Sequence, residues 1–249
     1  MGTSTRNRRA LAIGGTNLAL LGALAVILSG YGYQWNWWSL GTGFNIIPWG
    51  TGAAVLGGIA AAAGLWRMKD RSRGYTFAGV AGIVLGLLAL GNLGYWYMET
   101  QKGYPPIHDL STDTLNPPEF QAILPLREDA PNPAEYQRGE GVAAAQESFY
   151  SGLETITLDT TYDEAFNRAL ETARGMGWTM VDHSTEEGRI EAYHKLAWFG
   201  FVDDVVIRVD TTDFGSKVDI RSKSRIGRGD LGVNAWRIRQ YIEAFETQE

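Results

Sequence analysis

The chain has 249 residues, with 28 acidic and 22 basic side chains, a formal net charge of −6 and no cysteine. Seven of the basic residues but only one of the acidic residues precede Glu99, so the second part of the chain is strongly acidic. Such a part repels phosphate backbones, which excludes nucleic acid as an expected partner, and the lack of cysteine excludes disulfides, thiolate metal sites and a cysteine nucleophile.

Three apolar segments open the chain at residues 11–31, 49–66 and 75–97, and none of them contains Asp, Glu, Lys or Arg. Each is close to the roughly 20 residues that a helix needs to cross the hydrocarbon of a bilayer. The sequence therefore predicts a three-helix transmembrane anchor over residues 1–98. The stretch GTGFNIIPWG, between the first two segments, is interpreted as a short loop or half-helix at the membrane surface.

Basic and aromatic residues predict the orientation of this anchor. Basic residues precede the first segment and form most of RMKDRSR, between the second and the third. Both regions are expected in the cytoplasm by the positive-inside rule, so that three crossings of a bacterial inner membrane place the C-terminal part in the periplasm. Trp35, Trp37, Trp38 and Trp49 gather at the outer interface, where they are expected to contact lipids or a partner.

The spans also contain small and amide residues that favour helix contacts. Gly82 and Gly86 form a GxxxG motif, which predicts close packing either within the anchor or against a partner subunit. Asn17 and Asn92 are the main amide side chains at membrane depth, and we expect them to hydrogen-bond between helices. The lack of charge within the spans argues against a proton or ion path.

The extramembrane part divides by composition. Residues 99–140 are rich in proline and acidic residues and predict an extended arm that wraps around other elements. Residues 141–249 predict a folded domain. Its clearest helix begins at a capping box formed by Thr161 and Glu164, and its apolar residues recur at helical spacing until Gly175 and Gly177.

From Trp178 the apolar period changes to two, which predicts four strands. The turns between them are short, so neighbouring strands are expected to be antiparallel. A short strand in TITLD precedes them, and a final amphipathic helix is expected over residues 231–245. This element order predicts an α+β domain in which two helices cover one face of an antiparallel β-sheet.

Two adjacent carboxylates interrupt an apolar strand of this sheet. By alternation, Asp203 falls on the core-facing register and Asp204 on the polar register. A basic partner such as Arg225 or Arg228 would offset the cost of burying either carboxylate. These four residues are therefore predicted to form structural ion pairs.

Three ordered stretches, PPIHDLSTDTLNPPEF, GRIEAYHKLAWFGFVDDVVIRV and GSKVDIRSKSRIGRGDLGVNAWRIR, together resemble domain-of-unknown-function family 1499. The likeness runs from about Tyr104 to the C-terminus and leaves the three apolar segments outside it. It implies a bacterial or plastid domain that often follows transmembrane helices. The family has no settled biochemical function, so the resemblance implies no catalytic residue.

One constellation of imidazoles and carboxylates would form a hydrolytic or metal site if the arm folded back over the sheet: His108, Asp109, Asp113, His194, Asp203 and Asp204. In the alternative interpretation, the first two residues cap a turn and His194 is a hydrogen-bonded core histidine. The chain contains no P-loop, nucleophile elbow, dinucleotide-binding glycine motif or HExxH. No catalytic residue, resident metal or cofactor is therefore predicted.

Trp198, Phe199 and Phe201 cluster at a strand corner, either as part of the core or as a contact patch for the membrane, a lipid or another subunit. Taken together, these features favour a non-enzymatic, membrane-anchored accessory or scaffolding subunit of a membrane protein assembly. Its expected partners are membrane lipids and other membrane protein subunits. The alternative is a protein that binds a lipid or another hydrophobic ligand at the periplasmic membrane surface, and a metal-dependent hydrolase is the third hypothesis.

Overall fold

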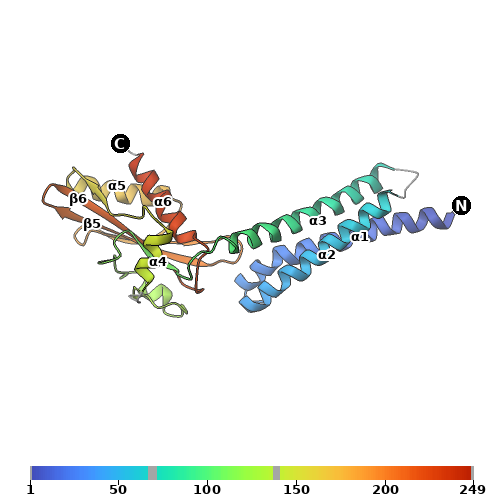
Figure 1. Ribbon diagram of the computed structural model, residues 1–249, viewed down its shortest axis with the longest axis horizontal. Coiled ribbons are helices and arrows are strands. Elements are labelled where there is room, and N and C mark those ends of the chain that lie inside the picture. The colour runs from blue at the N-terminus through green and yellow to red at the C-terminus, as the bar shows by residue number, and fades with distance from the viewer. Residues whose placement is uncertain (1, 67–71, 137–140, 248–249) are drawn as a thin grey trace. The chain divides into compact units, whose positions relative to one another are not determined.

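The computed structural model describes residues 2–66, 72–136 and 141–247, so that the basic loop residues Arg67, Lys69 and Arg71 lie outside the described ranges. The chain divides into two compact units (Figure 1). The first unit contains residues 1–102 and 197–200, and the second contains residues 103–196 and 201–249.

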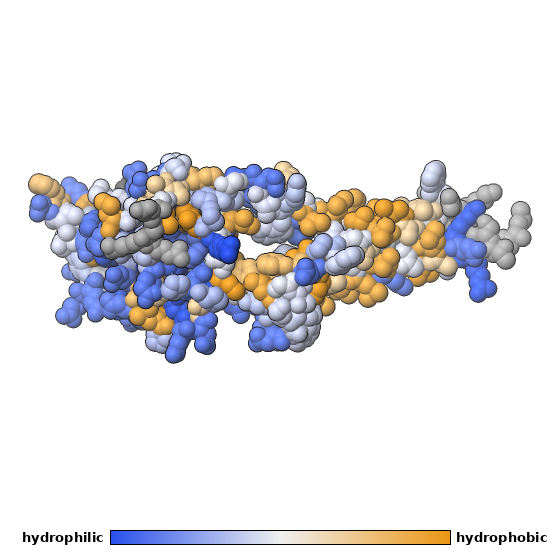
Figure 2. All heavy atoms as spheres, turned by 60° about the horizontal axis from the view of Figure 1, so that its bottom comes forward, coloured by the Kyte–Doolittle hydropathy of each residue, from blue (hydrophilic) through white to orange (hydrophobic). Residues whose placement is uncertain are grey.

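The first unit is built from three long helices, α1 (Gly2–Gln34), α2 (Leu40–Trp66) and α3 (Arg73–Thr100). All three are long and apolar enough to cross a membrane, and the helices present a largely hydrophobic surface (Figure 2). At about 1.5 Å per residue, each helix is longer than the roughly 30 Å hydrocarbon core of a bilayer. The predicted membrane anchor thus has the helices that it requires.

The start of α2 differs from the expectation for the stretch between the first two apolar segments. Residues 41–50 form neither a loop nor a separate half-helix, because they belong to the first turns of α2, and Pro48 lies inside that helix. A proline removes one backbone donor, which membrane helices tolerate where neighbouring groups or local adjustments compensate. The apolar pattern alone therefore places the start of this helix too late.

Small residues bring α1 and α2 into backbone contact. A methyl group added at Gly15 would lie 2.4 Å from the backbone nitrogen of Ala61, and one added at Gly22 would lie 2.4 Å from that of Ala54. The two pairs run in opposite directions along the chain, so the helices are antiparallel. Along α1, small residues at positions 12, 15, 19 and 22 alternate steps of three and four, which is the spacing of a left-handed helix pair.

The GxxxG motif packs α3 against the other two helices. A methyl group at Gly82 would lie 2.9 Å from Thr16 Oγ1, and one at Gly86 would lie 2.9 Å from the carbonyl oxygen of Ala54. Thr16 Oγ1 also donates a hydrogen bond to Ala78 O at 2.7 Å, which joins α1 to α3. The structure therefore places both glycines inside the helical unit.

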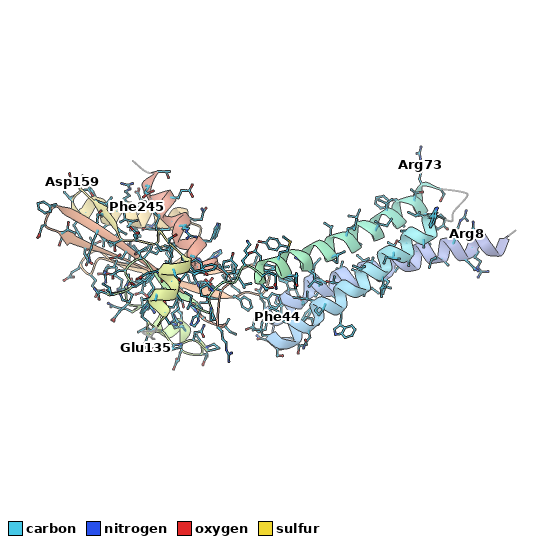
Figure 3. All side chains as sticks on the ribbon, viewed as in Figure 1. Arg8, Phe44, Arg73, Glu135, Asp159 and Phe245 are labelled. Carbon is cyan, nitrogen blue, oxygen red and sulfur yellow. The ribbon has the colours of Figure 1, made fainter. Side chains whose placement is uncertain are left out.

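The two ends of the helical unit differ in chemistry. Arg8 and Arg73 lie at one end, and Phe44 lies at the other (Figure 3). Trp35 and Trp37 occupy the turn between α1 and α2, where their ring centroids are 4.8 Å apart and their exposed fractions are 52% and 60%. One end is thus cationic and the other aromatic.

The second unit is an α+β domain built on a six-stranded antiparallel sheet. Its strands β3 (Thr179–Ser184), β4 (Arg189–Lys195), β5 (Val202–Thr212) and β6 (Gly215–Ser224) pair in chain order, as the alternation predicts. Strand β6 also pairs with two short strands, β1 (Asp109–Ser111) and β2 (Ile156–Leu158).

Two helices, α5 (Tyr162–Gly175) and α6 (Val233–Glu246), cover one face of this sheet. The predicted capping box is confirmed, because Thr161 Oγ1 accepts from Glu164 N–H while the Glu164 carboxylate accepts from Thr161 N–H. The core between sheet and helices is one apolar cluster that includes Phe166, Ile190, Ile207, Ile220, Ile238 and Tyr241.

The arm covers the opposite, polar face of the sheet. It contains β1 and a short 3-10 helix, η1 (Leu124–Arg127), and its Phe120 and Ile123 pack on Val206 of β5. The next helix, α4 (Val142–Phe149), fixes β1 through Gln146, whose amide bonds the backbone N–H and C=O of Ser111 at 3.1 and 2.6 Å. Helices α5 and α6 therefore cover one face of the sheet, and the arm covers the other.

Candidate functional site

The face beneath the arm carries charged side chains that are removed from water. Six of them are at most 1% exposed: Asp109, Glu191, Asp204, Asp219, Arg221 and Lys223. Burying a charge is costly unless the charge is paired and hydrogen-bonded. Whether these groups are structural or available for chemistry therefore depends on their hydrogen-bond and ion-pair partners.

Asp109 of β1 lies between two cations of β6. Arg221 Nε and Nη2 donate to its two carboxylate oxygens at 2.8 and 2.9 Å, and Lys223 Nζ donates at 2.8 Å. Both cations also reach the arm, since Arg221 donates to Pro118 O at 3.0 Å and Lys223 to Glu135 O at 2.7 Å. Burial lowers the pKa of Lys223, and the negative charge of Asp109 opposes that shift.

Asp204 of β5 forms a second ionic group. Arg225 binds it in a bidentate manner, with Nε–Oδ2 and Nη2–Oδ1 distances of 3.0 and 2.7 Å. Arg127, from η1, lies 3.2 Å from the same carboxylate and donates through Nη2 to Asn132 O at 3.0 Å. Burial raises the pKa of Asp204, whereas its hydrogen bonds and charge interaction with Arg225 lower it.

The carboxylate of Glu191 holds the start of η1 against the sheet. It accepts from three consecutive backbone N–H groups, those of Gln121, Ala122 and Ile123, at 2.8, 3.1 and 2.8 Å. Arg189 Nη1 donates to the same side chain at 2.6 Å. A fully buried acid thus satisfies three backbone donors of the turn that leads into η1.

Arg208 links two carboxylates of a further ionic group. Its Nη2 donates to Asp219 at 2.9 Å and to Asp113 at 3.1 Å. Asp219 also accepts from the hydroxyls of Thr112 and Thr155 at 3.0 and 2.6 Å. These contacts attach the segment that follows β1 to the centre of the sheet.

On the helix-covered face, Asp203 pairs with a cation from α6. Arg237 Nη2 lies 2.7 Å from Asp203 Oδ2 and 3.3 Å from His194 Nδ1, and Arg237 Nη1 donates to Asn234 Oδ1 at 2.8 Å and to Ser222 Oγ at 3.0 Å. Burial and the charge of Arg237 lower the pKa of His194, while Asp203 raises it. Sequence reasoning did not identify Arg237, although a carboxylate on the core-facing register requires a cation from the covering helix.

The predicted His and Asp constellation does not converge. His194 and Asp203 are register neighbours on the helix-covered face, whereas Asp109, Asp113 and Asp204 lie on the face beneath the arm in separate ionic groups. Within residues 2–66, 72–136 and 141–247, no group of three or more His, Cys, Asp or Glu side chains is placed to hold a metal ion.

His108 and Arg228 meet through a backbone atom. His108 is buried, and its Nδ1 lies 3.3 Å from the carbonyl oxygen of Arg228, while its Nε2 has no hydrogen-bond partner. The side chain of Arg228 is exposed. Of the two cations proposed for the adjacent carboxylates, the structure brings Arg225 to Asp204 and leaves Arg228 at the surface.

A hollow of about 410 Å³ opens over the arm, with Arg221 among its lining residues. The guanidinium of Arg221 lies 4.7 Å from the ring centre of Phe120 and 5.2 Å from that of Tyr136. Because the same guanidinium is engaged with Asp109, it is not free to recognise an anion. Glu119 also lines this hollow.

The predicted aromatic patch is divided between the two units. Trp198 and Phe199 belong to the helical unit, where Trp198 Nε1 donates to Ile27 O at 2.9 Å and the Phe199 ring lies 4.9 Å from that of Phe44. Phe199 is only 6% exposed. Phe201 belongs to the second unit. These aromatics therefore do not form one exposed patch.

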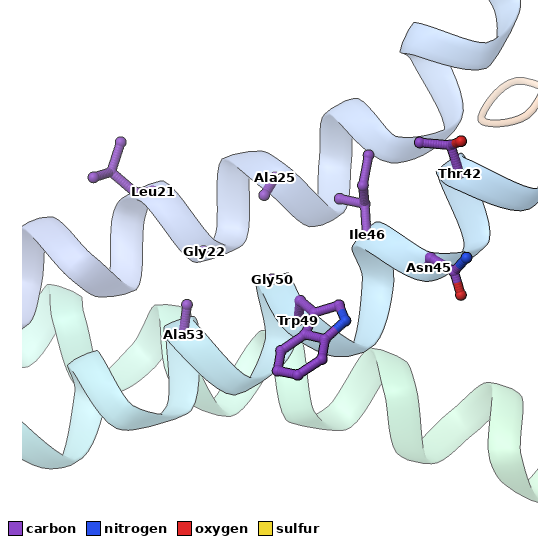
Figure 4. A pocket seen from close by; sticks show the side chains of 9 residues that line it. All are labelled: Leu21, Gly22, Ala25, Thr42, Asn45, Ile46, Trp49, Gly50 and Ala53. Atoms are coloured by element: carbon purple, nitrogen blue, oxygen red, sulfur yellow. The ribbon is translucent and has the colours of Figure 1, made fainter. Parts of the chain in front are cut away.

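Trp49 lies beside a hollow of about 450 Å³ between α1 and α2 (Figure 4). The hollow is mostly apolar, and its lining residues are Leu21, Gly22, Ala25, Thr42, Asn45, Ile46, Trp49, Gly50 and Ala53. Trp49 itself is 82% exposed. At membrane depth, such a surface faces lipid or another protein.

Comparison with known proteins gives one family. The family model DUF1499, described as a protein of unknown function, matches residues 109–245. No curated protein and no solved structure matches the chain. The matched region begins at β1 and ends in α6, so it contains the sheet, most of the arm and the ionic groups described above.

Proposed function

Because the chain belongs to the DUF1499 family, whose function is unknown, we propose a role on physical grounds. The protein is a non-enzymatic accessory or scaffolding subunit of a membrane protein assembly in a bacterial inner membrane. Its three helices hold the α+β domain on the periplasmic side. Its partners are membrane lipids and other membrane protein subunits.

The internal use of its charged groups is the observation that carries this proposal. Asp109, Glu191 and Asp204 each meet two or more fixed donors, most of them from buried residues. A general acid or base must exchange a proton with a substrate, whereas the oxygens of these carboxylates accept hydrogen bonds from fixed donors of the protein itself. The arrangement supports a rigid structural domain rather than a reaction centre.

The distribution of charge supports the proposed orientation. Arg8 and Arg73 mark the cationic end of the helical unit (Figure 3), and basic residues favour the cytoplasmic side of a membrane. The other end carries the exposed rings of Trp35 and Trp37. Since α3 starts at the cationic end, the chain that follows it emerges at the aromatic end.

The aromatic end is the contact surface that we assign to a partner. Trp35, Trp37 and Trp49 are exposed at 52%, 60% and 82%. Tryptophan is enriched both at membrane interfaces and among the residues that dominate protein–protein binding energy. A partner subunit that covers these rings would bury a large apolar area.

Co-purification from native membranes in a mild detergent, followed by native mass spectrometry, tests the proposal. The full chain should retain a stoichiometric protein partner, and Trp37→Ala should weaken that complex. Trp66→Ala is the matched control, because Trp66 is 84% exposed but ends α2 at the cationic end. A wild-type chain that always elutes as a monomer, or equal effects of both variants, would contradict the assignment.

A further inference from the structure

Helix α1 has a second side that its own chain does not cover. Small residues at positions 12, 15, 19 and 22 pack on α2, and the residues two positions further along lie about 200° round the helix, on the opposite side. All four of these residues are exposed, and we name them the outer seam: Gly14, Asn17, Leu21 and Leu24. Their alternating steps of three and four are the spacing of a left-handed helix pair.

Asn17 is the polar member of the outer seam. Within residues 11–31, all of which the structure describes, it is the only exposed residue with a polar side chain. It lies six residues into this apolar segment, which at about 1.5 Å per residue is about 9 Å from its start. An amide that faces hydrocarbon at this depth is costly, because lipid chains offer neither a donor nor an acceptor.

The interhelical hydrogen bonds expected of Asn17 and Asn92 are not formed within the chain. Asn17 has no partner among the described residues, whereas its neighbour Thr16 donates to Ala78 O at 2.7 Å. Asn92 Oδ1 is buried without a donor. Because the side chain of Asn17 is exposed, a group from outside the chain can reach it.

A membrane restricts how two copies of this chain can meet through α1. Every copy inserts in the same orientation, because the same distribution of basic residues sets it. Two paired α1 helices are therefore parallel, and a two-fold axis between them places each central residue opposite its own copy. A polar side chain at such a position must be able to satisfy itself.

Asn17 meets this requirement. Its amide carries both donors and an acceptor, so two copies can each donate to the other's carbonyl oxygen. The other seam residues carry no charge, so no like charges meet there. Extending the seam toward the N-terminus by the same spacing reaches Ala10 and Asn7, both exposed, and passes none of the arginines at positions 6, 8 and 9.

We propose that a second copy of this chain docks on the outer seam, with the two α1 helices parallel and the Asn17 amides hydrogen-bonded to each other. A methyl group added at Gly14 would meet no atom of its own chain, so the packing of one chain does not require this glycine. In a pair, it lets the second helix approach closely. The pairing uses the side of α1 and needs no partner at the aromatic end, so it is independent of the proposed accessory role.

Disulfide crosslinking of the full chain in native membranes tests the pairing, because the chain has no cysteine of its own. Leu21→Cys places a thiol on the outer seam at a position that is 65% exposed, and Leu88→Cys is the matched control on α3 at 66%. Oxidation should give a linked dimer as the main product for Leu21→Cys and only a trace for Leu88→Cys, since a disulfide requires Cα atoms within about 7 Å. No dimer from Leu21→Cys, or an equal or higher yield from Leu88→Cys, would overturn the proposal.

Native mass spectrometry of the full chain in a mild detergent measures the contribution of Asn17. Wild-type protein should show the mass of two chains, and Asn17→Ala should raise the dissociation constant of this dimer on the order of tenfold, as the loss of two interhelical hydrogen bonds predicts. Asn45→Ala, which removes an exposed amide of α2, is the control and should leave the constant unchanged. A monomeric wild-type chain, or equal effects of the two variants, would also overturn the proposal.

Discussion

Replacing Asp109 with Asn tests whether the buried charges hold the domain together. The change keeps the size of the side chain and removes its charge. Asp109 is 1% exposed and lies 2.8 Å from both Arg221 Nε and Lys223 Nζ. The variant therefore leaves two buried cations without the anion that they share.

The expected loss of stability follows from this geometry. Removing one partner of a buried ion pair costs about 3–5 kcal/mol, because the remaining charge is neither solvated nor paired. We expect Asp109→Asn to lower the free energy of unfolding of the α+β domain by about this amount. The arm should also become easier to cleave, since Arg221 and Lys223 hold the carbonyls of Pro118 and Glu135.

Denaturant titration of the full chain in mild detergent, followed by circular dichroism, measures the first effect, and limited proteolysis measures the second. Asp182→Asn is the matched control. Asp182 pairs with Arg189 at 3.0 Å, but its side chain is 45% exposed, so its loss should cost at most about 1 kcal/mol. If the two variants lose similar stability, the buried ion pairs of Asp109 contribute no more to folding than an exposed ion pair does.

Gly15→Ala should lower the thermal midpoint in detergent, because the added methyl group would lie 2.4 Å from the α2 backbone and overpacking costs about 1–3 kcal/mol. Gly14→Ala is the control, since a methyl group there meets no neighbouring atom. Equal midpoints of the two variants would argue against the helix contact. In denaturation experiments, Arg237→Met should lower the free energy of unfolding by about 3–5 kcal/mol, because it leaves the buried Asp203 without its cation. The double variant Arg237→Met, Asp203→Asn should regain much of this free energy, and strictly additive losses would disprove the pairing. Because burial lowers the pKa of His194, the stability that its neutral ring provides is present above the ordinary histidine pKa and lost as pH falls through the lower folded-state value. His194→Gln should reduce this loss on acidification from about pH 7, and an unchanged stability–pH curve would contradict it.

The regular elements could be predicted because their signals are local. Alternation located β3 to β6, and the capping box located the start of α5. Strand β1 has only three residues and carries no periodic signal, so it remained within the predicted arm. The first turns of α2 were missed because Pro48 and nearby glycines resemble a loop, although a proline is tolerated inside a membrane helix.

The ionic groups could be predicted only in part. Alternation assigned Asp203 and Asp204 to opposite faces and suggested Arg225 as a partner, since strand register is a property of the local chain. The contacts of Arg127 depend on how the arm folds across the sheet, and those of Arg237 depend on which turn of α6 lies over the carboxylate. Both are long-range relations that residue spacing does not contain.

Thiol labelling in intact cells tests the central claim, that three spans separate the α+β domain from the cationic end of the anchor. The chain has no cysteine, so single substitutions report without background. Ser151→Cys lies at an exposed position after α4, and Ser72→Cys lies at the exposed start of α3. A maleimide that cannot cross the inner membrane should label the first variant in intact cells and the second only after lysis. Labelling of Ser72→Cys but not of Ser151→Cys in intact cells would contradict the account.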